Sequence, residues 1–189
     1  MQKGLLETGA VGQEGSSGLL ERARYLSALT ESFAAVASSS RGRLVLIGGE
    51  AGVGKTLLVR RFCEDAGRST RVLEGSCHAL FTPSPLGPLL DVAETTGGEL
   101  SVLLAAGARA QEVLVELIRE LGRRSPTILL IEDVHWADEA TLDVLRLLAR
   151  RVVAVPALVV ATYRNDELDR VHPLRTVLGE LATGESIQR

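Results

Sequence analysis

The sequence predicts an α/β fold in which a parallel sheet is covered by helices on both faces. Three apolar runs without charged residues (44–47, 127–131 and 157–162) are typical of strands buried on both sides. Segments with apolar residues at helical spacing separate these runs, and this alternation favours parallel strands joined by right-handed crossovers. With 189 residues, 46% of them hydrophobic and 24% charged, the chain has the composition of one globular domain.

The first part of the chain is expected to contain two helices and two strands. Residues 1–18 carry five glycines and two serines, and we expect a flexible segment ahead of a domain over 19–189. A helix is predicted over 19–38, a strand over 44–47, a second helix from Lys55 to about Gly67 and a second strand over 70–75. The expected inner face of the second helix consists of Leu57, Leu58, Phe62 and Ala66.

The rest of the chain continues the alternation. Pro88 is expected to open a short helix, and the segment 97–121 holds two more. Asp138 is suited to cap a helix that runs to about Arg151, and a last helix is expected over 172–182. Strands are predicted over 127–131 and 157–162, and a fifth begins within 186–188.

The segment 44–56 reads L-V-L-I-G-G-E-A-G-V-G-K-T and contains the pattern G-x-x-x-x-G-K-[ST] of a phosphate-binding loop. Glycines let successive backbone N–H groups point to one place, and a helix N-terminus beside them suits a polyanion. Lys55 would bind the β- and γ-phosphates, and Thr56 would bind Mg²⁺. An ordinary glycine-rich corner would not require those two residues. The expected contacts of ATP and ADP are Gly49, Glu50, Ala51, Gly52, Val53, Gly54, Lys55, Thr56 and Leu57.

Two acids, Glu132 and Asp133, follow an apolar strand and supply what phosphate chemistry needs. One carboxylate can hold the Mg²⁺ shell while the other orients or activates water. The alternative is a solvated acidic loop. Arg164 ends the strand 157–162 and has a planar fork suited to the γ-phosphate, although a surface pair with Asp166 or Glu167 is its plain alternative.

Other features limit the possible functions. His135 would either sense the nucleotide or polarise Asp133, or it is a packed or solvent-facing side chain. Trp136 is expected to anchor a loop rather than to stack on a base. Cys63 and Cys77 have no C-x-x-C spacing, so neither a disulfide framework nor a zinc site is indicated. A net charge of -3, no signal-peptide pattern and no apolar run near eighteen residues predict a cytoplasmic chain without membrane or direct nucleic-acid contacts.

Five stretches in order carry a family resemblance: L-L-E-R, G-E-A-G-V-G-K-T, C-H-A-L-F-T-P-S-P-L-G-P-L, I-E-D-V-H-W-A-D-E-A-T-L and T-Y-R-N-D-E-L. Together they resemble the AAA-like ATPase module of large ATP-binding LuxR-type transcriptional regulators, which belong to the signal-transduction ATPases with numerous domains. The module is also similar to origin-recognition-type ATPases. The resemblance covers nearly all of residues 19–189.

The resemblance implies a P-loop NTPase three-layer sandwich with strand order 5-1-4-3-2, in which the fifth strand is incomplete. It assigns Lys55 and Thr56 to phosphate and Mg²⁺, and it places Glu132 at the metal-side acid. Asp133 falls at the water-activating acid and Arg164 at the sensor position. Many relatives read Asp-Asp or Asp-Glu at 132–133, so the identity of the base stays open.

Three functions are compatible with these residues. The first is a signalling switch that binds ATP, hydrolyses it slowly and acts on an effector outside this chain, such as a DNA-binding, cyclase or kinase domain. The second is an oligomeric remodelling or origin-recognition ATPase that self-associates and receives an arginine from a neighbour. The third is a non-catalytic nucleotide-binding fragment, since lid and effector domains are expected after residue 189. The candidate arginines for the second function are Arg150, Arg151 and Arg175.

Overall fold

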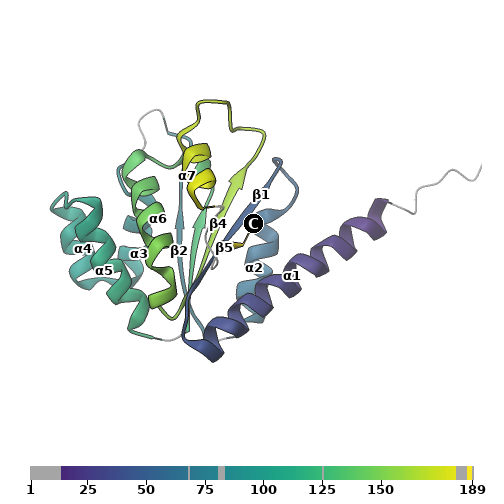
Figure 1. The fold of residues 1–189 in the computed structure, drawn as a ribbon, viewed down its shortest axis with the longest axis horizontal. Helices are drawn as coiled ribbons and strands as arrows, with labels where there is room; N and C mark the ends of the chain where they lie inside the picture. Colours follow the sequence, from purple (N-terminus) through teal and green to yellow (C-terminus); the bar gives the residue numbers. More distant parts are fainter. Residues whose placement is uncertain (1–13, 68, 81–83, 125, 182–186, 189) are drawn as a thin grey trace, which may run out of the picture.

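A computed structural model describes residues 14–67, 69–80, 84–124, 126–181 and 187–188 (Figure 1). The strands are β1 (Arg43–Gly49), β2 (Arg71–Ser76), β3 (Thr127–Glu132), β4 (Ala157–Arg164) and β5 (Ile187–Gln188). The helices are α1 (Glu14–Ser39), α2 (Lys55–Asp65), α3 (Gly87–Thr96), α4 (Gly98–Ala105), α5 (Ala110–Gly122), α6 (Glu139–Arg151) and α7 (Pro173–Leu181). Two 3₁₀ turns, η1 (Val134–Trp136) and η2 (Val152–Ala154), flank α6.

The five strands form one parallel sheet in the order β2-β3-β4-β1-β5, which confirms the predicted order. β4 lies between β3 and β1, with Ile131 opposite Ala161 and Gly49 opposite Arg164. β5 pairs Ile187 with Leu44, so the fifth strand predicted at the end of the chain is present beside β1.

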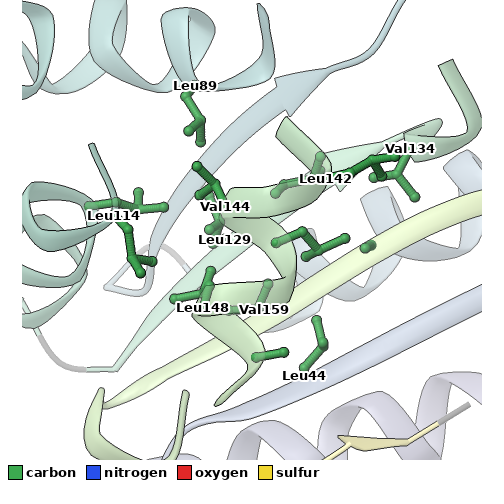
Figure 2. Close-up of a cluster of buried hydrophobic side chains, with 14 of the residues drawn as sticks. Leu44, Leu89, Leu114, Leu129, Val134, Leu142, Val144, Leu148 and Val159 are labelled. Carbon is green, nitrogen blue, oxygen red and sulfur yellow. The ribbon is translucent and has the colours of Figure 1, made fainter. Parts of the chain in front are cut away.

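Helices cover both faces of the sheet, and side chains that alternate along each strand supply a core to each layer. In β3, Ile128 and Leu130 pack toward α1 and α2, whereas Leu129 and Ile131 pack toward the layer of α3 to α7. Figure 2 shows the second of these cores, where Leu129 meets helix side chains that include Leu148. Burial on both faces explains why this strand contains no polar residue between Ile128 and Ile131.

Gly75 lets the helical layer approach the edge of the sheet. A Cβ at this position of β2 would lie 2.0 Å from the carbonyl oxygen of Pro88 in α3. Since no side chain fits there, any other residue would push α3 away from β2. α3 follows the connection after β2, and Pro88 lies in its first turn, as predicted.

Two local expectations need correction. α1 begins at Glu14 rather than at Leu19, and the predicted flexible segment is otherwise outside the described residues, as is Ser186 of the predicted fifth strand. Leu57 was expected on the inner face of α2, but it is 62% exposed. Val59 is buried instead, together with Phe62. Because a helix turns about 100° per residue, these two residues, three positions apart, lie on nearly the same face.

Two buried carboxylates in α5 were not expected. Glu116 and Glu120 are 4% and 2% exposed, although the helix is otherwise amphipathic. Glu120 pairs with Arg71 of β2 and, at 3.0 Å, with Arg123, while Arg123 also lies 3.5 Å from Glu116. These pairs satisfy charges that burial would otherwise penalise, so we assign them a structural role.

The sheet brings the carboxyl ends of β1, β3 and β4 to one edge. Arg164 at the end of β4 lies opposite Gly49, the first residue of the phosphate-loop pattern, and Glu132 ends the neighbouring strand β3. Parallel sheets bind ligands at this edge, outside the carboxyl ends of the strands. None of the helices in the described ranges combines the length and the apolar character needed to cross a bilayer.

Candidate functional site

The loop between β1 and α2 has the backbone geometry of an anion-binding turn. Gly52 and Gly54 adopt φ angles of +77° and +91°, a region that side chains with a Cβ rarely enter. Gly54 is the residue before α2 and, as a glycine, it has no side chain to cap the first N–H groups of that helix. Those donors therefore remain available to a negatively charged ligand.

Lys55 follows this turn directly and bends back over the loop. Its ammonium donates to the carbonyl oxygens of Gly49, at 2.7 Å, and Glu50, at 2.8 Å. Partial burial lowers the pKa of Lys55, and the nearby carboxylate of Asp133 opposes that shift. Lys55 thus places a positive charge over the loop and near Asp133, which follows β3.

The remaining loop residues lie at the surface or in the first turn of α2. Glu50, Ala51, Gly52 and Val53 are exposed, and Thr56 is half-buried in the first turn of α2. The backbone N–H of Ala51 points to a carboxylate oxygen of Asp166 at 3.5 Å, which places the segment after β4 against the loop.

The two acids after β3 have different surroundings. Glu132 is the last residue of the strand, and its Oε1 is buried without a hydrogen-bond partner among the described residues. Asp133 lies just beyond the strand and has a φ of +55°. Its N–H donates to the hydroxyl of Thr162 at 3.0 Å, so a side chain of β4 holds this turn in place.

A buried carboxylate oxygen without a partner is costly unless a cation or water binds it. Glu132 therefore fits the metal-side role that the family resemblance implies for it. Within the described ranges, no cluster of three or more His, Cys, Asp and Glu side chains could hold a metal ion. A Mg²⁺ here would consequently need the hydroxyl of Thr56, water or phosphate oxygens in addition to the two acids.

Arg164 reaches the same place from the end of β4. Its Nε lies 3.9 Å from Oδ1 of Asp133, and one of its terminal nitrogens lies 2.5 Å from Oε1 of Glu167. The hydrogen bond to Glu167 is the main reason why the pKa of Arg164 is raised. The structure contains the pair with Glu167 that was the plain alternative for this arginine, and the role of Arg164 toward a γ-phosphate stays a prediction.

His135 is packed beneath these groups. Its side chain is 1% exposed, with Nδ1 3.8 Å from Asp133 and Nε2 3.6 Å from Glu167. Neither nitrogen has a hydrogen-bond partner among the described residues, and burial lowers the pKa of the imidazole. Its carbonyl oxygen meets the ring of His172 at 3.1 Å.

Glu167 is a site residue that the sequence suggested only as a surface partner of Arg164. Its carboxylate contacts both Arg164 and His135, and it lies in the segment 165–172 that connects β4 to α7. The available signal was its position three residues after Arg164, within T-Y-R-N-D-E-L. Sequence spacing does not show that a third group, His135, approaches the same carboxylate.

A cavity of about 960 Å³ opens beside the phosphate loop and is walled on one side by α1. Arg22 and Tyr25 of α1 line it, and a Cβ at Gly54 would lie 3.1 Å from the guanidinium of Arg22. Nothing in the local pattern indicated that α1 belongs to the site. The other lining residues include Leu29, Ile47, Gly49, Lys55, Tyr163 and Asn165.

The three arginines proposed to act on a neighbouring molecule are not part of this constellation. Arg150 and Arg151 lie at the end of α6, and Arg150 contacts Glu180 at 3.4 Å. Because α6 has thirteen residues, its last turn is about 20 Å from the end next to Asp133. Arg175 is exposed on α7.

The sequence profile of the AAA ATPase domain (AAA_16) matches residues 18–160 of this chain. "Uncharacterized protein R02095" of Rhizobium meliloti (strain 1021) is 25% identical over 196 residues, an alignment that covers 78% of this chain and 19% of that protein. The chain therefore spans about a fifth of this relative.

Two solved structures share the fold. One is Cdc6p from Pyrobaculum aerophilum, with a TM-score of 0.57 and 17% identity over 97% of this chain and 47% of that one. The other is the Orc1 protein of Aeropyrum pernix, solved in complex with DNA, with a TM-score of 0.56 and 20% identity over 88% of this chain and 44% of that one. At these identities the likeness concerns the fold alone.

Proposed function

We propose, from the premise that this chain belongs to the family of AAA ATPase domains, that it is a switch module that binds Mg·ATP and hydrolyses it slowly. One observation carries the proposal. Lys55, Asp133 and Arg164 come from three separate segments, and their charges meet at the carboxyl edge of the sheet beside a loop with free helix N–H groups.

The charges of this cluster suit a triphosphate better than a neutral ligand. Lys55 and Arg164 are cations within reach of the same acid, and the loop adds backbone donors. The ammonium of Lys55 would exchange its two loop carbonyls for phosphate oxygens, and Arg164 would take the γ-phosphate as sensor.

Thr56, Glu132 and Asp133 are the residues that would hold Mg²⁺, partly through water. The ion would supply charge neutralisation between the β- and γ-phosphates. The orphaned oxygen of Glu132 supports its place in this set. Asp133 would accept the proton of the water whose oxygen bonds to the γ-phosphorus, as the bond to the leaving ADP oxygen breaks.

The effector follows from the family resemblance rather than from this site. The motifs E-D-V-H-W-A-D-E-A-T-L and T-Y-R-N-D-E-L suggest a module of a LuxR-type transcriptional regulator of the signal-transduction ATPase class. A DNA-binding effector would lie outside these residues, since the described helices carry no basic recognition face and the net charge is -3.

The test is a calorimetric titration of the chain with Mg·ATP, with Lys55→Ala as the diagnostic variant. Losing a charged hydrogen-bond donor to phosphate should weaken binding by about 1.5–3 kcal/mol, or roughly 10- to 150-fold. Arg61→Ala is the matched control, because it removes an exposed cation of α2 that pairs with Glu64 and Asp65 of the same helix. Unchanged affinity in Lys55→Ala, or a folded wild-type chain that binds no nucleotide, would refute the proposal.

A further inference from the structure

Arg164 is paired with Glu167, although the proposed function needs its guanidinium to be available for a γ-phosphate. Its terminal nitrogen lies 2.5 Å from Glu167 Oε1, whereas its Nε is 3.9 Å from Asp133. Both members of the pair are only partly exposed, with 35% of the Arg164 side chain and 26% of the Glu167 side chain accessible. A carboxylate and a phosphate bind the guanidinium fork through the same N–H groups, so they compete for it.

His135 offers the same carboxylate a second partner. Nε2 of His135 lies 3.6 Å from Glu167 Oε2, slightly beyond hydrogen-bond distance, and the ring is 1% exposed. Both ring nitrogens lack a hydrogen-bond partner among the described residues. A buried polar ring without partners is unfavourable, and a small movement of Glu167 would satisfy one of its nitrogens.

We propose that Glu167 sets the preference of this site for ATP over ADP by exchanging partners. With no γ-phosphate present, its carboxylate holds Arg164; when a γ-phosphate takes Arg164, the carboxylate moves onto Nε2 of His135. This inference rests on the proposed function, because it assigns Arg164 to the γ-phosphate. Glu167 is then a specificity-determining residue that never touches the nucleotide.

The exchange leaves no charge without a partner. Arg164 passes from one anion to another, and Glu167 passes from a guanidinium to an imidazole N–H that is otherwise unpaired. ADP lacks the group that would take Arg164, so it leaves the pair intact. Glu167 therefore opposes ATP binding but does not affect ADP binding.

The decisive variant is Glu167→Gln, which keeps the size of the side chain and removes its charge. Calorimetric titrations with Mg·ATP and Mg·ADP should show ATP binding about fivefold tighter and ADP unchanged, the scale of a partly exposed ion pair. Glu94→Gln removes an exposed charge of α3 and should alter neither affinity. In an Arg164→Gln background, adding Glu167→Gln should no longer change ATP affinity.

His135→Phe tests the second half of the exchange. With no ring nitrogen to receive Glu167, the pair with Arg164 is harder to break, and ATP affinity should fall about threefold while ADP affinity stays constant. Circular dichroism of the variant establishes that the packed site still folds. If it does not, the milder His135→Gln, which keeps a donor in the pocket, should restore the ATP-over-ADP ratio of the wild type.

Several results would overturn the inference. Weaker ATP binding in Glu167→Gln would mean that Glu167 positions Arg164 for the phosphate rather than competing with it. An unchanged ratio of ATP to ADP affinity in this variant would remove Glu167 from discrimination altogether, while the proposed function stands. Failure of the wild-type chain to bind either nucleotide would overturn both proposals at once.

Discussion

Thr162→Val should loosen the turn that carries Asp133. Thr162 is 1% exposed in β4, and its hydroxyl accepts the backbone N–H of Asp133 at 3.0 Å. Asp133 has a left-handed φ of +55°, which an aspartate adopts only where its surroundings hold it. Valine has nearly the shape of threonine but has no acceptor, so the variant removes the hydrogen bond and little else.

The magnitude follows from leaving a partly buried donor unpaired. A net hydrogen bond is worth about 1 kcal/mol, and an unsatisfied buried group costs about 1–3 kcal/mol, so we expect a loss of roughly 2 kcal/mol in the free energy of unfolding. For a chain of this size that loss corresponds to a decrease of about 4–8 °C in the melting temperature.

Urea denaturation followed by far-ultraviolet circular dichroism measures the effect, and Thr95→Val serves as the control. Thr95 is exposed, and its hydroxyl donates to the carbonyl oxygen of Asp91 within α3 at 3.3 Å, so its replacement should change stability by less than about 0.5 kcal/mol. Single-turnover hydrolysis by Thr162→Val should fall more than ATP affinity does. A stability loss no larger than that of the control, together with normal turnover, would refute the reasoning.

Further predictions concern Asp133 and the two cysteines. Asp133→Asn should keep ATP affinity and stability, because asparagine tolerates left-handed geometry, but it should lose hydrolysis; full turnover would mean that Asp133 is not the base. Asp133→Ala should in addition lose about 1 kcal/mol of stability in the same urea assay. Burial raises the pKa of Cys63 to about 11 and that of Cys77 to about 12. The folded chain should therefore react with iodoacetamide far more slowly at pH 8 than the urea-unfolded chain, with a rate that rises as the pH approaches 11; equal rates would contradict this burial.

Short apolar patterns in the sequence were enough to predict the central strands of the sheet. The runs 127–131 and 157–162 predicted doubly covered strands, and the structure buries every residue of both between two helical layers. Such patterns are readable because burial on both faces leaves no position where a polar residue is tolerated. Strand order came from the family resemblance and not from these runs, since a parallel strand looks alike wherever it lies in the sheet.

The position of the candidate site was partly readable for a related reason. The loop 49–56 follows β1 and the acids 132–133 lie at the carboxyl end of β3, with β4 between the two strands. Parallel strands end on the same side of a sheet, so the loop and the acids were expected near one another. Leu57 shows what the apolar pattern leaves open, because α2 has apolar residues at 57, 58 and 59 and the sequence did not say which of them face the core.

The sequence by itself determined which residue types are available to the site, and it predicted their secondary structure. Only the tertiary structure decided which groups these residues contact. The N–H of Asp133 donates to Thr162, Arg164 pairs with Glu167, and His135 lies near the carboxylates of Asp133 and Glu167. The spacing of apolar residues along the chain indicates which positions are buried in a helix or strand, and this can be read from a short segment. A hydrogen bond or ion pair depends instead on strand register and loop path, which bring together residues far apart in the chain.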